Sequence, residues 1–170
     1  RGDVMNQIWH VVLDDQAHVI REQPISVNHG PSIHDCAITE NYVLIFDLPV
    51  TFSMKSLLKG YSFPYRWNPN HAARIGLLPR RGANADVIWI AVEPCYVFHT
   101  ANAYETADGM VIVDVVAHET MFAASSRGPD SDISALERWT IDPVGRRTQR
   151  QRLHAQPQEF PRYDERRTTR

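Results

Sequence analysis

The sequence predicts an all-β protein. Short runs in which apolar and polar residues alternate dominate the chain, and turn-forming residues separate them about every ten residues. Only one short segment has the character of a helix. Many short strands at this spacing are typical of a β-sandwich, a barrel or a propeller, and no clear internal repeat distinguishes these three architectures.

Two pairs of strands are expected near the start of the chain. Gln7–Leu13 and Ala17–Arg21 flank an acidic turn, which predicts a hairpin. Ile33–Thr39 and Asn41–Phe52 form the second expected pair. Pro49 lacks a backbone N–H, so we expect the end of the latter strand to lie at a sheet edge.

One helix and six further strands are expected after these pairs. The helix covers Ser53–Lys59, where Ser53 can cap the N-terminus and Gly60 can end the helix. Arg162–Arg170 is rich in arginine and has no apolar pattern, so we expect a solvated tail. The expected strands are Ala73–Leu78, Val87–Val92, Cys95–Thr100, Met110–Ala117, Leu136–Ile141 and Gln149–His154.

The composition excludes several classes of protein. The 170 residues include 18 basic and 20 acidic side chains, for a formal net charge of −2, so we expect no nucleic-acid partner. No mainly apolar run approaches the roughly 20 residues that span a bilayer, and no secretory leader pattern is recognisable. Cys36 and Cys95 cannot form a disulfide framework. We therefore expect a cytoplasmic protein, and no amphipathic patch supports contact with a membrane surface.

Two of the eight histidines stand out as candidate metal ligands. His34 belongs to a polar His-Asp pair that interrupts an apolar strand start. His99 follows three apolar or aromatic residues, and alternation places its side chain on the face opposite Phe98. A buried imidazole needs partners for both nitrogens, which a metal and a carboxylate can supply. No HxH, HExxH or CxxC spacing is present, so spacing alone does not establish a metal site.

The remaining histidines give no comparable indication of a metal site. His18, His71 and His154 lie among charged or turn residues and are expected to be structural, while His29 belongs to a loop. His10 and His118 lie in or at the end of predicted strands, where either a structural or a functional role is open.

Three segments carry a resemblance to a known family. They are HDCAITENY at residues 34–42, FHTANAYE at 98–105 and QEFPR at 158–162. In this order they resemble the carotenoid cleavage oxygenase family, which also includes stilbene-cleaving dioxygenases and the retinoid isomerase, and the strands and loops between them, including WTIDP at 139–143, are similar to that family as well. The resemblance implies a seven-bladed β-propeller with ferrous iron, Fe(2+), on its axis.

The resemblance also implies roles for three residues. Family members hold the iron with four histidines, and glutamates hydrogen-bond the outer nitrogens of these rings. By position in the matching segments, His34 resembles the second iron ligand and His99 the third, and Glu159 resembles the glutamate that orients His99. We then expect the Glu159 carboxylate to accept a hydrogen bond of about 2.6–3.2 Å from a ring nitrogen of His99.

The resemblance further implies that the chain is an internal part of an enzyme. Family enzymes are much longer, and this chain begins at Arg1 rather than at a methionine. Residues 1–170 are expected to form about three blades of the propeller domain, without its N- and C-terminal parts and without the first and fourth histidines. Because open blades expose strand edges, we expect the isolated chain to be inactive.

The activity implied by the resemblance is that of an iron(II)-dependent dioxygenase. Its partners would be O2 and an apolar conjugated small molecule, a carotenoid or apocarotenoid whose carbon–carbon double bond is split into two carbonyl products. A stilbene is the alternative substrate, and a non-catalytic β-propeller segment is the alternative to an enzyme. Phe98 and Phe160 are candidates for the wall of an apolar substrate tunnel, or for ordinary core packing.

Overall fold

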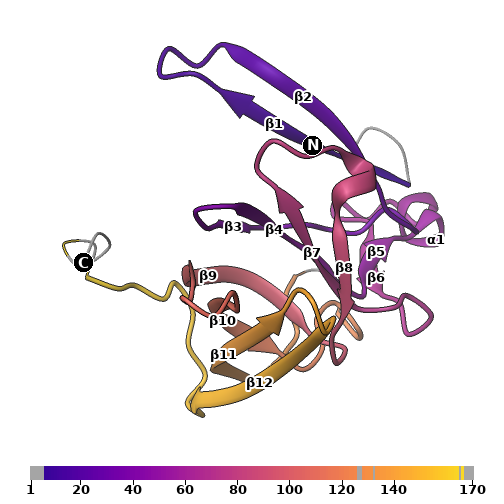
Figure 1. The fold of residues 1–170 in the computed structure, drawn as a ribbon. Coiled ribbons are helices and arrows are strands. Elements are labelled where there is room, and N and C mark those ends of the chain that lie inside the picture. Colours follow the sequence, from indigo (N-terminus) through magenta and orange to yellow (C-terminus); the bar gives the residue numbers. More distant parts are fainter. Residues whose placement is uncertain (1–5, 126–127, 132, 165, 167–170) are drawn as a thin grey trace.

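The computed structural model describes residues 6–125, 128–131, 133–164 and 166, and this part of the chain is all-β apart from two short helical turns (Figure 1). The fold class predicted from the sequence is confirmed. Two four-stranded antiparallel sheets make up most of the structure, and two-stranded ribbons accompany them. Four-stranded antiparallel sheets are the units from which propeller blades are built.

The first sheet has the strand order β3-β4-β7-β8. Its strands are β3 (Cys36–Ile38), β4 (Tyr42–Asp47), β7 (Arg74–Pro79) and β8 (Ile88–Ala91). The predicted single strand Asn41–Phe52 is wrong, because the chain leaves the sheet at Leu48 and Pro49. The residues that follow form β5 (Val50–Phe52), which pairs with β6 (Tyr65–Trp67), a strand that the alternation did not predict.

The short helix α1 (Met54–Leu58) connects these two ribbon strands. The Ser53 hydroxyl accepts a hydrogen bond of 3.2 Å from the backbone N–H of Ser56, and Gly60 adopts a left-handed φ of 77° after the helix. The predicted N-cap and stop are therefore confirmed. A further turn, η1 (Asn84–Asp86), precedes β8. No helix in the described residues is long and apolar enough to cross a membrane.

The second sheet is a meander in the order β12-β11-β10-β9. Each of its strands was expected; three of the observed strands are longer than predicted, and the fourth, at residues 111–118, has the predicted length but is shifted by one residue. Glu137 and Trp139 lie on one face of this sheet, where the Trp139 indole N–H donates to Glu137 at 2.9 Å and Arg150 forms an ion pair with the same carboxylate at 2.8 Å. The strands are β9 (Tyr96–Glu105), β10 (Val111–His118), β11 (Ser134–Asp142) and β12 (Arg147–His154).

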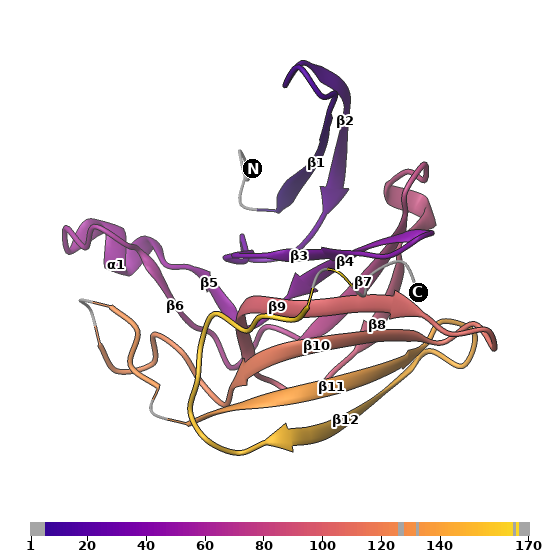
Figure 2. The same cartoon turned by 90° about the vertical axis from the view of Figure 1, so that its left-hand side faces the viewer.

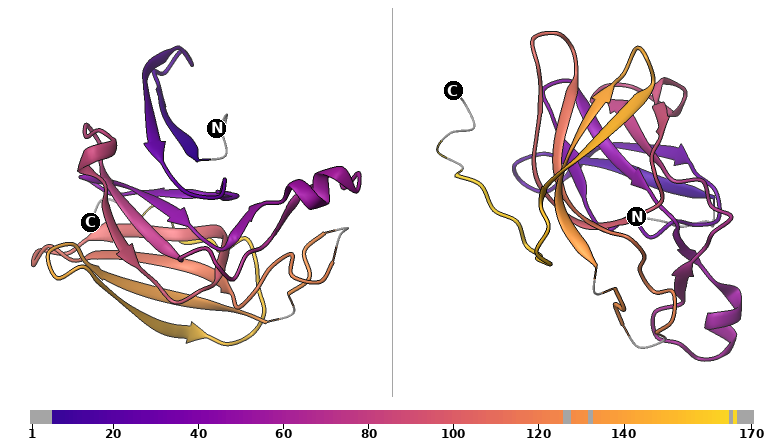
Figure 3. Two further views of the ribbon diagram at one scale, coloured as in Figure 1. Left: turned by 90° about the vertical axis from the view of Figure 1, so that its right-hand side faces the viewer. Right: turned by 90° about the horizontal axis from the view of Figure 1, so that it is seen from below.

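The two sheets pack face to face over one large apolar core, and Figure 3 shows them as two layers. Leu44 and Phe46 of β4 point into this core, where the ring of Phe46 lies 6.0 Å from that of Trp139. Val43 and Ile45 point to the opposite face and pack against Ile25. Because β4 is covered on both faces, it is continuously apolar instead of alternating.

The predicted N-terminal hairpin consists of β1 (Gln7–Leu13) and β2 (Val19–Ser26) and stands apart from the two layers (Figure 2). The described residues thus form two four-stranded sheets and two two-stranded ribbons, and the division into about three blades stays a prediction. At the other end of the chain, Arg162, Tyr163, Asp164 and Arg166 are exposed, as expected for a solvated tail. Residues 165 and 167–170 of that tail lie outside the described residues.

Candidate metal centre

A β-bulge in β9 determines where His99 points. Val115 of β10 pairs with Thr100, and Ala117 pairs with Val97, so Phe98 and His99 together oppose a single residue of β10. The prediction that Phe98 and His99 lie on opposite faces is therefore wrong. The ring centroids of Phe98 and His99 each lie 5.1 Å from that of His34.

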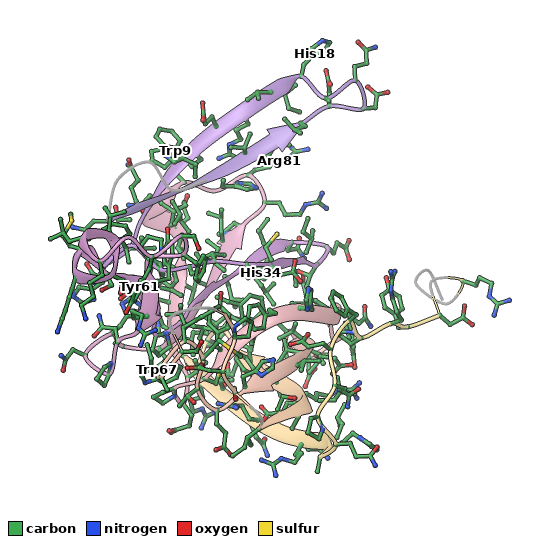
Figure 4. The ribbon with its side chains drawn as sticks, turned by 180° about the vertical axis from the view of Figure 1, so that it is seen from behind. Trp9, His18, His34, Tyr61, Trp67 and Arg81 are labelled. Carbon is green, nitrogen blue, oxygen red and sulfur yellow. The ribbon has the colours of Figure 1, made fainter. Side chains whose placement is uncertain are left out.

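His34 lies in the segment that leads into β3, where this segment passes β9 (Figure 4). Its Nδ1 is 2.8 Å from the carbonyl oxygen of Phe98. A carbonyl oxygen only accepts hydrogen bonds, so Nδ1 of His34 carries the proton and Nε2 carries a lone pair. The structure thus brings His34 and His99 together, with His34 exposed and His99 half-buried.

Glu159 holds the His99 ring from the far end of the chain. After β12 the chain turns back and runs along β9, as Figure 2 shows, and the His99 Nδ1 donates a hydrogen bond of 2.7 Å to Glu159 Oε2. The hydrogen bond expected from the sequence is confirmed. Because a carboxylate only accepts, Nε2 of His99 also carries a lone pair. Neither Nε2 atom has a hydrogen-bond partner among the described residues.

His118 is a site residue whose role the sequence left open. It is buried at the end of β10, and its Nε2 donates a hydrogen bond to Glu159 Oε1. Glu159 therefore accepts a hydrogen bond from one imidazole on each carboxylate oxygen. The only sequence signal for this role is a histidine at the end of an apolar strand, a pattern that many core histidines share.

Two further carboxylates tie the His34 segment to β9. Asp35 Oδ2 accepts hydrogen bonds from the backbone N–H and the hydroxyl of Thr100, at 2.8 and 2.9 Å. Glu105 accepts hydrogen bonds from Thr39 and from the backbone and side chain of Asn41. Burial alone would raise the pKa of Glu105, but these three hydrogen bonds outweigh it and lower the pKa below its ordinary value.

The remaining histidines have other surroundings, although His10 lines the same cavity of about 490 Å³ as His34. His71 is buried, as suits a structural role: its Nε2 donates to Asp47 at 2.7 Å, and its Nδ1 is 3.1 Å from that of His29. His18 and His154 are exposed. His10 is half-buried, and its Nδ1 has no partner among the described residues; burial, followed by the charge of Arg21, lowers its pKa.

The candidate wall residues have different surroundings. Phe98 packs in the aromatic core with Tyr96 and Phe122. Phe160 is exposed and lies against His99, with ring centroids 4.5 Å apart, beside a pocket of about 260 Å³. A larger cavity of about 490 Å³, open to solvent, lies between the N-terminal hairpin and the first sheet. Its lining is mainly apolar and includes His34.

The donor set fits part of a transition-metal site. In the neutral form of each ring, Nε2 has the lone pair with which histidine binds a metal, and a carboxylate fixes one of the rings. Within the described residues, no group of three or more histidine, cysteine, aspartate or glutamate side chains is arranged to hold a metal ion. Any metal held here needs additional ligands.

Comparisons with known proteins point to one family. The sequence model of the retinal pigment epithelial membrane protein (RPE65) family matches residues 3–170. Carotenoid cleavage oxygenase of Mycobacterium tuberculosis (strain ATCC 25618 / H37Rv) is 33% identical over 202 residues, covering 94% of this chain and 40% of that protein. Isoeugenol monooxygenase of Pseudomonas nitroreducens is 30% identical over 148 residues, covering 84% of this chain and 30% of that protein.

Solved structures agree with this sequence match. Lignostilbene dioxygenase of Pseudomonas brassicacearum superposes with a TM-score of 0.78 at 27% identity, covering 95% of this chain and 35% of that one. The cobalt-substituted Synechocystis ACO superposes with a TM-score of 0.74 at 26% identity, covering 89% and 33%. The chain spans less than half the length of each of these relatives. Since the family model matches nearly every residue, the chain belongs to the carotenoid oxygenase (RPE65) family.

Proposed function

We propose that this chain is part of an iron(II)-dependent dioxygenase that cleaves a carbon–carbon double bond of a carotenoid or apocarotenoid with O2, giving two carbonyl products. The observation that carries the proposal is the pair of neighbouring imidazoles, His34 and His99, whose Nε2 lone pairs are both free of hydrogen bonds within the described residues. Family membership supports an oxygenase activity.

His34 and His99 would hold the iron together with ligands from outside this chain. Neutral imidazole suits Fe(II), and the similar Synechocystis ACO structure is cobalt-substituted, which supports a transition metal in this family. When bound, iron would supply the redox chemistry that O2 requires. The residues of this chain orient that centre, because Glu159 fixes the His99 ring and the Phe98 carbonyl fixes His34.

An apolar substrate agrees with the surroundings of His34. The cavity of about 490 Å³ that includes His34 is lined mainly by aliphatic side chains, among them Ile8, Ile25 and Val43. Such a surface binds a hydrocarbon chain by removing apolar area from water. The names of the relatives, which include carotenoid oxygenases, support the same class of substrate.

A stilbene is the second candidate substrate. The structural similarity to a lignostilbene dioxygenase favours it, whereas the identity of 33% to a carotenoid cleavage oxygenase favours the carotenoid. For the chain in isolation, a non-catalytic propeller segment remains the alternative, because the described residues provide no complete metal site.

The test uses the full-length protein that contains this chain, loaded with iron(II). We expect O2 uptake and two carbonyl products, identified by mass spectrometry, with an apocarotenoid and less turnover with a stilbene. His34→Ala and His99→Ala should each abolish turnover, and His154→Ala, at an exposed position, should retain it. Faster turnover of the stilbene would select the second candidate, and iron-independent turnover or full activity of His99→Ala would overturn the proposal.

A further inference from the structure

We infer that His118 is a positioning residue: it fixes the Glu159 carboxylate and thereby holds the His99 ring in the orientation that binds the metal. This inference rests on the iron site of the proposed function and not on its substrate. Its basis is a chain of three side chains, in which His99 Nδ1 donates to Glu159 Oε2 at 2.7 Å and His118 Nε2 donates to Glu159 Oε1.

Glu159 needs such a support because its own segment is irregular. It follows β12 in a part of the chain without strand pairing, and its side chain is 26% exposed. With one oxygen bonded only to water, the carboxylate could rotate about its side-chain bonds. A second donor from β10, a central strand of the sheet, removes that freedom.

The environment of His118 determines which nitrogen donates. Its side chain is 7% exposed, and its ring packs edge-on against Phe98 at a centroid distance of 5.4 Å. Since Glu159 only accepts, Nε2 carries the proton and Nδ1 carries a lone pair. That Nδ1 is buried and has no hydrogen-bond partner among the described residues.

That Nδ1 lacks a partner within the part of the chain that the structure describes argues against a purely structural role. A buried polar atom without a partner lowers stability, and an aromatic hydrocarbon side chain would fill the same space beside Phe98 without this cost. The hydrogen bond from Nε2 to Glu159 explains why position 118 holds a histidine instead of a hydrocarbon side chain.

The test compares His118→Phe, which keeps a ring but removes the donor, with His118→Gln, whose amide N–H can take the place of Nε2. The protein is the full-length enzyme, and the measurements are iron(II) affinity by chelator competition and the Tm without metal. We expect His118→Phe to weaken iron(II) binding by about 10- to 100-fold at an equal or higher Tm. His118→Gln should restore most of the affinity, and the matched control His154→Phe, in exposed β12, should leave it unchanged.

Each other outcome has a definite meaning. If His118→Phe binds iron(II) as tightly as the parent protein, the role of His118 is overturned and the proposed function is unaffected. The same holds if His118→Phe and His118→Gln lose iron(II) affinity equally, because the loss would then come from packing instead of from hydrogen bonding. A parent protein that binds iron but cleaves no double bond overturns the proposed function and leaves this inference standing. A parent protein without iron binding overturns both.

Discussion

Two partners that can only accept a hydrogen bond fix both candidate ligands. The Phe98 carbonyl binds Nδ1 of His34, and the Glu159 carboxylate binds Nδ1 of His99. Each partner selects the ring form with a free lone pair on Nε2, so the chain sets the donor atoms without help from a metal.

The first prediction at the scale of single residues concerns Glu159→Gln. A carboxylate offers an acceptor oxygen to each of the two imidazole N–H donors, whereas an amide has one oxygen and presents an N–H to the other donor. We expect iron(II) affinity of the full-length enzyme, measured by chelator competition, to fall by about 10- to 100-fold. Glu119→Gln, at an exposed position, is the control and should have no effect. Unchanged affinity in Glu159→Gln would contradict this role.

A second residue-scale prediction concerns packing in the first sheet. Gly76 pairs with Trp89 across β7 and β8, and a Cβ added at Gly76 would lie 2.7 Å from the Trp89 ring. We expect Gly76→Ala to destabilise the protein by about 1–3 kcal/mol, measured as a lower urea midpoint. Gly128→Ala, where a Cβ meets nothing within 4 Å, should change stability by less than about 0.5 kcal/mol. Equal midpoints for both variants would contradict the account.

At the scale of elements, β9 is the strand on which the site is assembled. Its bulge directs Phe98 and His99 toward His34, and Asp35 and Glu105 hold the neighbouring segment on it at two points. The site therefore depends on pairing between elements as well as on its own side chains.

The pH dependence of this pairing is the prediction at the element scale. The pKa of Glu105 in the folded protein lies below its ordinary value of 4.5, so its stabilising effect is complete above pH 4.5 and is lost as the pH falls through the folded pKa. Glu105→Gln should lower the Tm at pH 7, and the difference from the parent should shrink below pH 4.5. Glu40→Gln, at an exposed position, should show no such convergence. A difference in Tm that stays constant down to pH 3 would contradict the assignment.

Alternation predicted most strands because a half-buried strand places apolar residues on one face. The prediction from alternation failed where a strand is interrupted, very short or bulged. The strand through Pro49 breaks because proline lacks the N–H that the ladder requires, and β6 has only three residues. The bulge at Phe98 and His99 was invisible because one extra residue leaves the sequence pattern almost unchanged.

The candidate site was predictable only through its matching segments. His99 and Glu159 are 60 residues apart, and no local spacing connects them. His118 was missed as a partner of Glu159 because a histidine at the end of an apolar strand has the same pattern whether it packs or donates.

At the scale of the whole molecule, the two packed sheets bring two candidate metal ligands, His34 and His99, together but provide no third ligand within the described residues. The isolated chain should therefore hold iron weakly or not at all, because metal affinity depends on a complete set of ligands. Metal analysis after dialysis should give far less than one iron per chain. Stoichiometric iron that resists a chelator would contradict this prediction, and substitution of His10 and His118 would then locate the extra ligands.

The position of Glu159 also has a consequence for the order of events during synthesis. It follows His99 by 60 residues and His118 by 41 residues, so the ribosome releases both histidines well before the carboxylate that holds them. The hairpin of β9 and β10 consists of local contacts and can form early, whereas the return of the chain along β9 must wait for β11 and β12. The His99 ring is thus set only after the second sheet is complete, so the candidate metal centre is finished after the strands on which it lies.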